Sequence, residues 1–247
     1  KGTVIVKHAN PCGVSARNDH LESYKSALSC DPISAFGGIV SCNFKIKRDL
    51  AVELNKLFLE VIIANGFDSN AIKILNAKKN LRLIDGTNYT SEELFKFVSF
   101  NQNIIIQSED LNIFAKKNFK VVSKRKPTSK QLKDLIFAFN VCRYVKSNAI
   151  VLASNEATVG IGSGQPSRLD SCQIAINKMK KFNLQTDNLV AASDAFFPFV
   201  DGIEKLVQSG VRAVIQPSGS IRDKEIINFA NETDTVLLFS KTRHFRH

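Results

Sequence analysis

The chain lacks several features that would place it in a membrane or outside the cell. No stretch approaches the ~20 apolar residues that span a bilayer, and no charged segment followed by a long apolar run marks a signal peptide at its start. These absences predict a cytoplasmic protein that does not contact membranes. Because the chain begins at Lys1, almost inside an apolar run, we also expect it to be a fragment of a longer polypeptide.

Paired cysteines are missing as well. The five cysteines are odd in number and widely spaced, and no Cys-x-x-Cys occurs, which predicts reduced thiols in a cytoplasmic protein rather than a disulfide framework. Zinc deaminases carry His-x-Glu followed later by Pro-Cys-x-x-Cys. Here His8 is followed by Ala9 and Asn10, and Cys12 has no second cysteine three positions on. The sequence therefore predicts no zinc at this segment.

The net charge of +11 and pI near 9.5 suggest a polyanionic partner. The positive residues, however, are scattered, and the one dense run, at residues 124–126, precedes Pro127 as in a linker. Aromatic residues are not interleaved with the basic ones as they are in proteins that stack on bases. An anionic small-molecule substrate fits the charge equally well. A basic module that binds RNA or another polyanion stays open as an alternative.

With 44% hydrophobic and 23% charged residues the composition is that of a globular protein. Strand-length apolar runs alternate with helical patterns, which predicts an α/β fold. The expected strands are residues 4–7, 38–42, 61–64, 81–84, 104–107, 149–153, 158–161, 189–192, 213–216 and 236–239. The expected helices are residues 21–29, 49–59, 69–77, 129–145, 167–182, 202–208 and 223–231. Ser167 and Ser220, each three positions before an acidic residue, are expected to start helices.

A domain boundary is expected in the basic, proline-containing segment 119–129. We therefore divide the chain into a first domain over residues 1–121 and a second over residues 122–247. Each part carries about five predicted strands, so two similar α/β units are plausible, although the residues show no strong repeat.

Residues 7–13 form the most informative segment. An apolar run ends in Lys7 and His8, and the Pro11 and Gly13 that follow predict a turn that bends the chain there. A histidine of ordinary pKa can accept a proton near neutral pH, and a neighbouring ammonium can stabilise negative charge. The pair suits a catalytic site. The alternative is a strand end with a solvated lysine and a hydrogen-bonded histidine.

Three further segments each allow a functional and a structural interpretation. In residues 31–38, Phe36 beside two glycines makes either a platform for a flat ring or a plug under a loop. Residues 160–168 form a glycine-rich link to a helix, which suits an anion or a tight turn. Residues 193–199 place three phenylalanines close to a proline. They form either part of the core or the wall of a pocket for an aromatic cofactor, in which Asp201 would be a polar contact. The last residues, 243–247, either dock into a cleft or fray.

Six segments together, the five above and residues 143–148, resemble one family, the AICAR transformylase part of the bifunctional purine-biosynthesis protein that also carries IMP cyclohydrolase. They are residues 7–13, 31–38, 143–148, 162–168, 193–199 and 243–247, in order along the whole chain. The resemblance implies two cytidine-deaminase-like α/β/α units with mixed sheets and no zinc. It also implies transfer of the formyl group of 10-formyltetrahydrofolate to the 5-amino group of AICAR, giving FAICAR and tetrahydrofolate.

The resemblance assigns roles to individual residues. His8 matches the proton acceptor, Lys7 the residue that stabilises the transition state, and Asn148 a contact close to the reacting groups. The AICAR-binding positions are Phe36, Gly37, Glu60, Asn148, Arg168 and Arg243, with at least one arginine expected at the phosphate. The folate-binding positions are Leu169, Phe196, Asp201, Ser220 and Ile221.

The family also implies a homodimer whose active sites combine residues of two chains, and it leaves room for a bound monovalent cation; no nucleic-acid partner is expected. Two parts of the family's pattern are missing from this sequence. Without the cyclohydrolase domain the chain is not expected to close FAICAR to IMP. An upstream segment that contributes to AICAR binding is also absent, so a catalytically incomplete remnant is the second alternative.

Overall fold

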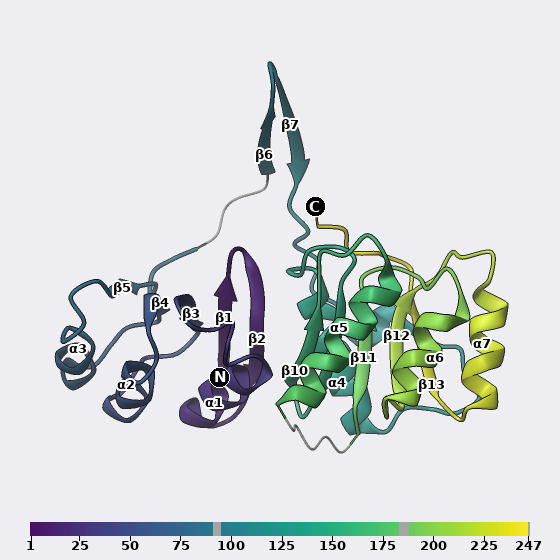
Figure 1. The fold of residues 1–247 in the computed structure, drawn as a ribbon, viewed down its shortest axis with the longest axis horizontal. Coiled ribbons are helices and arrows are strands. Elements are labelled where there is room, and N and C mark those ends of the chain that lie inside the picture. The colour runs from purple at the N-terminus through teal and green to yellow at the C-terminus, as the bar shows by residue number, and fades with distance from the viewer. Residues whose placement is uncertain (91–94, 183–187, 247) are drawn as a thin grey trace.

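The computed structural model describes residues 1–90, 95–182 and 188–246. Most of their strands join one mixed sheet of 11 strands, in the order β5-β4-β3-β1-β2-β10-β9-β11-β12-β13-β8 (Figure 1). Within these residues, no helix has both the length and the apolar character needed to cross a membrane. The expected α/β class is confirmed, but the two expected sheets are continuous with each other.

The first half forms one end of this sheet and contains two strands in a hairpin followed by three helix–strand units. Strands β1 and β3 are antiparallel, and β3, β4 and β5 run parallel. The elements are β1 (Gly2–Lys7), β2 (Asn10–Ala16), α1 (His20–Cys30), β3 (Gly38–Cys42), α2 (Arg48–Asn55), β4 (Leu59–Ala64), α3 (Ser69–Leu75) and β5 (Arg82–Asp85).

The second half repeats this order and these strand directions after an additional helix. Its elements are α4 (Ser129–Cys142), β9 (Ile150–Ser154), β10 (Ala157–Gly162), α5 (Arg168–Lys181), β11 (Val190–Ser193), α6 (Val200–Gln208), β12 (Ala213–Pro217), α7 (Asp223–Glu232) and β13 (Val236–Ser240). The halves meet where β2 pairs with β10 in antiparallel fashion at Ser15 and Ala157. The fold is therefore an internal duplication, with the two copies related by an approximate two-fold axis through the β2–β10 junction.

The segment between the halves contributes a second, separate sheet. Strands β6 (Phe95–Phe100) and β7 (Asn103–Ser108) form a hairpin that projects away from both halves (Figure 1). The strand expected at residues 104–107 is thus present, but in this hairpin. A short 3-10 helix (Lys116–Asn118) leads into β8 (Phe119–Val121), which pairs with β13. The domain division at residue 121 stays a prediction, although β8 belongs to the second half by its pairing.

Helix starts follow local capping chemistry where the sequence provides it. The Asp19 carboxylate accepts from the backbone N–H groups of Leu21 and Glu22 at the start of α1. Ser167 does precede α5, but its side chain makes no capping hydrogen bond. Ser220 does not start α7 as expected, because its hydroxyl accepts from Arg222 in the loop and the helix begins three residues after it.

Helix α2 ends four residues earlier than predicted. The sequence pattern predicted a helix over residues 49–59, whereas α2 ends at Asn55 and Leu59 already begins β4. Leu59 is paired with Gly38 of β3 and is buried, so its place in the parallel sheet overrides its helical propensity.

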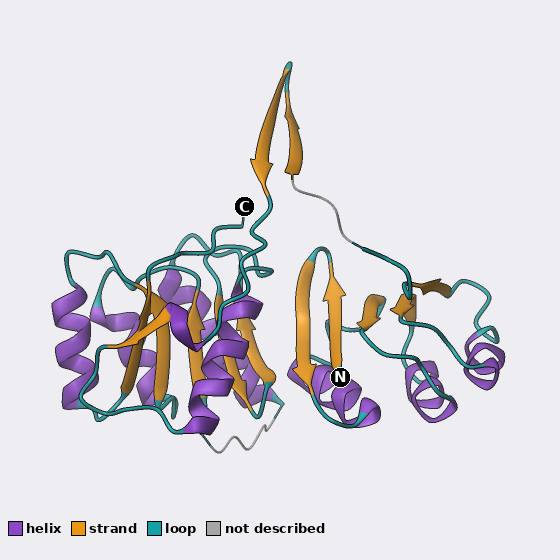
Figure 2. Cartoon of the chain, turned by 180° about the vertical axis from the view of Figure 1, so that it is seen from behind, coloured by secondary structure: helices purple, strands orange, loops and turns teal. Residues whose placement is uncertain are grey.

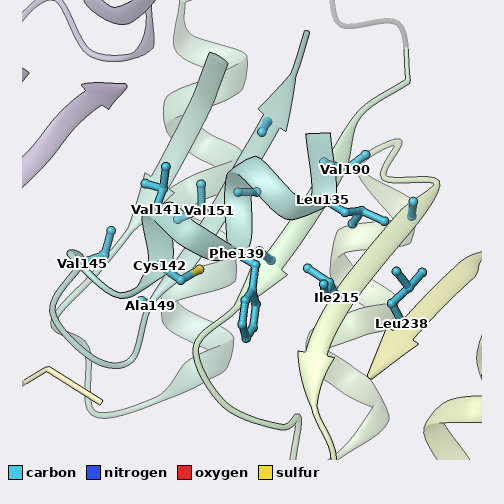
Figure 3. Close-up of a cluster of buried hydrophobic side chains, with 14 of the residues drawn as sticks. Leu135, Phe139, Val141, Cys142, Val145, Ala149, Val151, Val190, Ile215 and Leu238 are labelled. Atoms are coloured by element: carbon cyan, nitrogen blue, oxygen red, sulfur yellow. The ribbon is translucent and has the colours of Figure 1, made fainter. Parts of the chain in front are cut away.

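Three clusters of buried side chains hold the layers together. Helix α4 packs on one face of the second half around Leu135, Phe139 and Cys142 (Figure 3). Helices α5–α7 pack on the opposite face around a second cluster, and α1–α3 cover one face of the first half around a third (Figure 2). Among the described residues the first half has no helix equivalent to α4. The expected α/β/α layering is therefore correct for the second half, whereas the first half has two layers.

Candidate functional site

The turn between β1 and β2 presents the Lys7–His8 pair. Lys7 pairs with Asn10 across the hairpin, so His8 and Ala9 are the two turn residues, with φ of 49° and 64°. Positive φ at both central residues is typical of a type I′ turn. The turn expected at Pro11 and Gly13 is wrong, because both residues lie inside β2. The chain nevertheless bends beside Lys7, and His8 is exposed at the tip of the hairpin.

Gly13 serves helix packing rather than a turn. A Cβ atom at Gly13 would lie 1.9 Å from the carbonyl oxygen of Ala27 in α1. In the second half, a Cβ atom at Gly160 would lie 2.2 Å from the carbonyl oxygen of Ala175 in α5. Both glycines allow a helix to approach the second strand of its hairpin closely, which is a further sign of the duplication.

The loop before β3 meets Lys7. The Lys7 ammonium donates a hydrogen bond to the backbone oxygen of Phe36, and a Cβ atom at Gly37 would lie 2.9 Å from Lys7 Nζ. Gly37 has φ of +69°, and its N–H donates to the Phe58 oxygen over 2.8 Å. The Phe36 ring is 60% exposed and packs against the Phe58 ring at 5.2 Å between centroids. Phe36 is therefore an open aromatic surface beside an ammonium, not a buried plug.

Glu60 lies at an irregularity in the adjoining strand. Gly38 pairs with Leu59 and Ile39 pairs with Val61, so Glu60 is the extra residue of a bulge in β4. Bulges redirect side chains and occur frequently beside functional sites. Glu60 is exposed. Its strand, β4, pairs with β3, and β3 begins directly after Phe36 and Gly37.

A pocket of about 430 Å³ lies in the second half, where β11 ends and α5 and α6 begin. It brings together six of the residues expected to bind substrate or folate: Asn148, Arg168, Leu169, Phe196, Asp201 and Arg243. All three phenylalanines of segment 193–199 line it, although Phe197 is also buried in the core behind it. The segment is thus pocket wall and core at once.

A buried ion pair organises the inner end of this pocket. Arg168 donates to the carboxylate of Asp194 and, over 2.9 Å, to Ser193 Oγ. Its other terminal nitrogen donates to Asn148 Oδ1 over 2.7 Å. The two charged side chains are 8% and 0% exposed. Arg168 is therefore fixed by these contacts, and it in turn fixes the side chain of Asn148.

Asn148 is fixed from its other side as well. Its side-chain nitrogen donates to the backbone oxygens of Gln165 and Pro166 over 2.8 and 3.0 Å. Ser147 Oγ donates to Asp194 Oδ2 over 2.6 Å. The network thus couples the segment before β9 to the glycine-rich segment before α5, which is why residues far apart in sequence converge here.

The outer rim of the pocket carries Arg243. Its guanidinium is exposed and stacks over the Phe245 ring at 4.5 Å. The next residue, His244, is 1% exposed and packs against the rings of Phe114 and Phe139. The C-terminal segment therefore docks through His244, as one of the two alternatives predicted, and holds Arg243 at the pocket. His247 lies outside the described residues.

Ser220 and Ile221 do not line the pocket. Ile221 is 99% exposed in the loop before α7. The neighbouring Arg222 places its guanidinium 4.8 Å from the centre of the Phe199 ring, which does line the pocket. The two expected folate-binding residues thus lie next to the pocket wall on an open loop.

A hydrogen bond between a backbone N–H and a side-chain oxygen links the two groups of site residues. The N–H of Lys146 donates to Asn10 Oδ1 over 3.0 Å, which ties the hairpin turn to the segment that leads to Asn148. The described residues contain no group of three or more His, Cys, Asp and Glu placed to hold a metal ion. Cys12, next to the turn, is buried, and this burial raises the pKa of its thiol to about 11, so the thiol stays neutral.

Sequence reasoning missed Asp194 and Ser147. Asp194 follows a short apolar strand, a position at which polar side chains commonly reach a site, and this is the signal that could have identified it. Ser147 carries no such signal, because its role depends on Asp194, which lies 47 residues away along the chain.

The fold and the site define a duplicated α/β protein whose shared sheet carries, at one edge, a Lys–His turn and a pocket with aromatic walls. The family model described as the AICARFT/IMPCHase bienzyme matches residues 1–178. The chain belongs to this family.

Curated relatives agree along nearly the whole chain. The bifunctional purine biosynthesis protein PurH of Persephonella marina is 46% identical over 246 residues, which are 99% of this chain and 47% of that protein. The PurH proteins of Buchnera aphidicola subsp. Schizaphis graminum and Aquifex aeolicus are 48% and 44% identical, and each is matched over 47% of its length. The chain thus spans about half the length of these relatives.

Proposed function

We propose that this chain carries the AICAR formyltransferase site, which transfers the formyl group of 10-formyltetrahydrofolate to the 5-amino group of AICAR. The observation that carries the proposal is the turn after β1, where Lys7 contacts Phe36 and Gly37 and His8 is the next residue. An ammonium, an imidazole and an exposed aromatic ring therefore occur together at this turn and the loop beside it. Membership of the bienzyme family supports this function over a polyanion-binding module.

The amine of AICAR is a poor nucleophile because it is conjugated with the ring and its carboxamide. As its nitrogen attacks the formyl carbon, a C–N bond forms and His8 accepts the proton of the amine. The formyl oxygen gains negative charge, which the Lys7 ammonium stabilises. The bond from the formyl carbon to N10 of the folate then breaks, and N10 takes up a proton as tetrahydrofolate leaves.

The two groups of residues divide the substrates between them. Phe36 offers its exposed face to the AICAR ring, and the nearby Glu60 and Gly37 complete that side of the site. Because Arg168 is already paired with Asp194, we assign the AICAR phosphate to the exposed Arg243. The aromatic pocket with Leu169, Phe196 and Asp201 is proposed to receive the folate, and Ser220 and Ile221 would close over it.

We further propose a homodimer in which one site combines residues of two chains, with a monovalent cation as an additional ligand. The IMP cyclohydrolase activity of the family would reside in the part of the relatives that this chain does not span. If residues from that part also bind AICAR, the chain alone would bind substrate weakly or be inactive, and the longer protein would be needed for turnover.

The test is a formyl-transfer assay that follows tetrahydrofolate formation by the full-length protein and by this chain, with His8→Ala beside each. Loss of a positioned general base costs ~10²–10⁴-fold in rate, so His8→Ala should lose at least that much with its fold intact. His20→Ala is the matched control, because His20, the first residue of α1, is hydrogen-bonded to Asp49 of α2 and is not one of the proposed site residues. Unchanged turnover in His8→Ala would refute the assignment, and salt-sensitive RNA binding without turnover would favour the polyanion-binding module.

A further inference from the structure

Three consecutive residues of the C-terminal segment alternate between the pocket of the second half and the core. Arg243 and Phe245 line the pocket, whereas the side chain of His244 between them is 1% exposed. The backbone N–H of His244 donates to the backbone oxygen of Asp194 over 2.9 Å. The position of His244 in the core therefore decides where the Arg243 guanidinium lies.

Among the described residues, the carboxylate of Asp110 is the single hydrogen-bond partner of the His244 ring. Nδ1 of the ring bonds to Asp110 Oδ2, and its Nε2 atom is buried without a partner. Burial lowers the pKa of His244, so the ring is neutral near pH 7 and donates the hydrogen on Nδ1 to the carboxylate. A hydrogen bond to a charged acceptor is stronger than one between neutral groups. Asp110 therefore fixes both the tautomer and the orientation of this ring.

The end of helix α4 holds Asp110 in turn. Arg143, the residue after α4, donates to the backbone oxygens of Asp110 and Asn112 over 3.4 and 2.8 Å. The same guanidinium donates to the Tyr144 hydroxyl over 2.6 Å and lies 4.6 Å from the centre of that ring. The carboxylate that bonds to His244 thus comes from a stretch of backbone that is itself fixed to the second half.

We propose that Asp110 is a positioning residue which, through His244, holds the Arg243 guanidinium where it can bind the anionic group of the substrate. The proposal rests on the proposed function, which assigns the AICAR phosphate to Arg243. Asp110 is not among the residues that line the pocket, so its effect on the substrate is indirect. It lies 134 residues before His244 in the chain, and no local sequence pattern connects the two.

The expected effect is on affinity for the substrate rather than on turnover. Binding orders a side chain and its backbone, and a segment that is already fixed lowers that entropic cost. The phosphate takes no part in bond making, so a contact to it is equally strong in the ground state and the transition state. Asp110→Ala, which frees the segment, should therefore raise the KM and the Kd for AICAR at least about tenfold. It should change kcat less than about threefold.

The test measures AICAR binding by calorimetry and formyl transfer by steady-state kinetics in the full-length protein. Asp110→Asn is the second variant if Asp110→Ala does not fold, and its Kd should lie between the other two, because the amide oxygen is a neutral acceptor for His244. The matched control is Glu109→Ala, because Glu109 pairs with Lys96 of the hairpin and does not line the pocket. Hydrogen exchange at the N–H of His244 should become faster in Asp110→Ala and stay unchanged in Glu109→Ala.

A double-mutant cycle with Arg243→Ala separates a positioning role from a general loss of structure. If Asp110 acts through Arg243, adding Asp110→Ala to Arg243→Ala should change the Kd for AICAR by no more than about twofold. A merely structural role would make the two losses additive, so the double variant would bind a further ~10-fold more weakly. Additive losses would overturn the proposal.

Two other results would overturn this proposal and leave the proposed function standing. One is an unchanged Kd for AICAR in Asp110→Ala, with normal turnover in the unchanged protein. The other is faster exchange at His244 without weaker binding, because the segment would then be held by Asp110 to no effect on the substrate. If the unchanged full-length protein neither binds AICAR nor transfers a formyl group, the proposed function is refuted, and this proposal with it.

Discussion

Replacing Asp194 by Asn tests the ion pair that organises the pocket. The substitution keeps the size of the side chain and removes its charge. Arg168 would then be left as a buried guanidinium whose oxygen partners, on Ser193, on Asn148 and on the new amide at position 194, are all neutral. Because the side chains of Arg168 and position 194 are almost fully enclosed, solvent cannot replace the lost carboxylate.

Removing one partner of a buried pair typically costs about 3–5 kcal/mol. For a chain of this length, each kcal/mol lowers Tm by about 2–4 °C. Asp194→Asn should therefore lower Tm by about 6–20 °C. The double variant Arg168→Met, Asp194→Asn has no uncompensated buried charge, so it should regain part of the lost Tm. A double-mutant cycle with the two single variants then gives the coupling free energy between the two side chains.

The assay is thermal unfolding followed by circular dichroism at constant pH and salt. The matched control is Asp234→Asn, which breaks an Arg–Asp pair with the exposed Arg125. Exposed pairs contribute up to about 1 kcal/mol, so the Tm of this variant should fall by no more than about 4 °C. If Asp194→Asn and Asp234→Asn lower Tm equally, the argument that burial makes the Arg168 pair essential is wrong.

Three further predictions concern titration, packing and thiol reactivity. Burial lowers the pKa of His244, so protonation of this side chain favours the unfolded chain. The free energy of unfolding should therefore fall as the pH drops below about 6.5. Urea unfolding at several pH values should show a smaller fall of this free energy in His244→Gln than in the unchanged protein. Gly13→Ala should destabilise the protein by about 1–3 kcal/mol or more, because its Cβ would collide with the carbonyl oxygen of Ala27. Gly86→Ala is the control, because its Cβ would lie 3.6 Å from the nearest atom and should cause no such loss. Equal urea midpoints for the two variants would refute the close approach of α1 to Gly13. Burial raises the pKa of Cys12 to about 11, so a thiol reagent at pH 8 should modify it only after unfolding, and rapid modification of the folded chain would contradict this.

Local sequence patterns were sufficient to identify many elements and the segments of the site. Helix α4 carries apolar residues at spacings of three and four, and this period alone predicted it to within a few residues of its end. The Lys7–His8 pair was identified because two titratable side chains follow an apolar run. Such signals are local, since strand and helix periods and turn residues act over a few positions.

Other features depended on contacts between distant residues, and the sequence by itself did not determine them. Pro11 and Gly13 are frequent turn residues, but pairing with β1 and close packing of α1 place them in a strand. Arg168 was one of two arginines predicted to contact the substrate, with at least one of them at the phosphate. The fold pairs its guanidinium with the buried carboxylate of Asp194.

The amino-acid sequence alone determined the α/β class, the order of most elements and the residue types available for catalysis, because these follow from local periodicity and side-chain chemistry. Only the tertiary structure decided that the two halves share one sheet, that the described residues leave one face of the first half without a helix, and that Arg168 is buried against Asp194 whereas Arg243 is exposed. Each of these depends on which surfaces meet, and the free energy of those contacts is set by burial and pairing across the whole chain rather than by neighbours in the sequence.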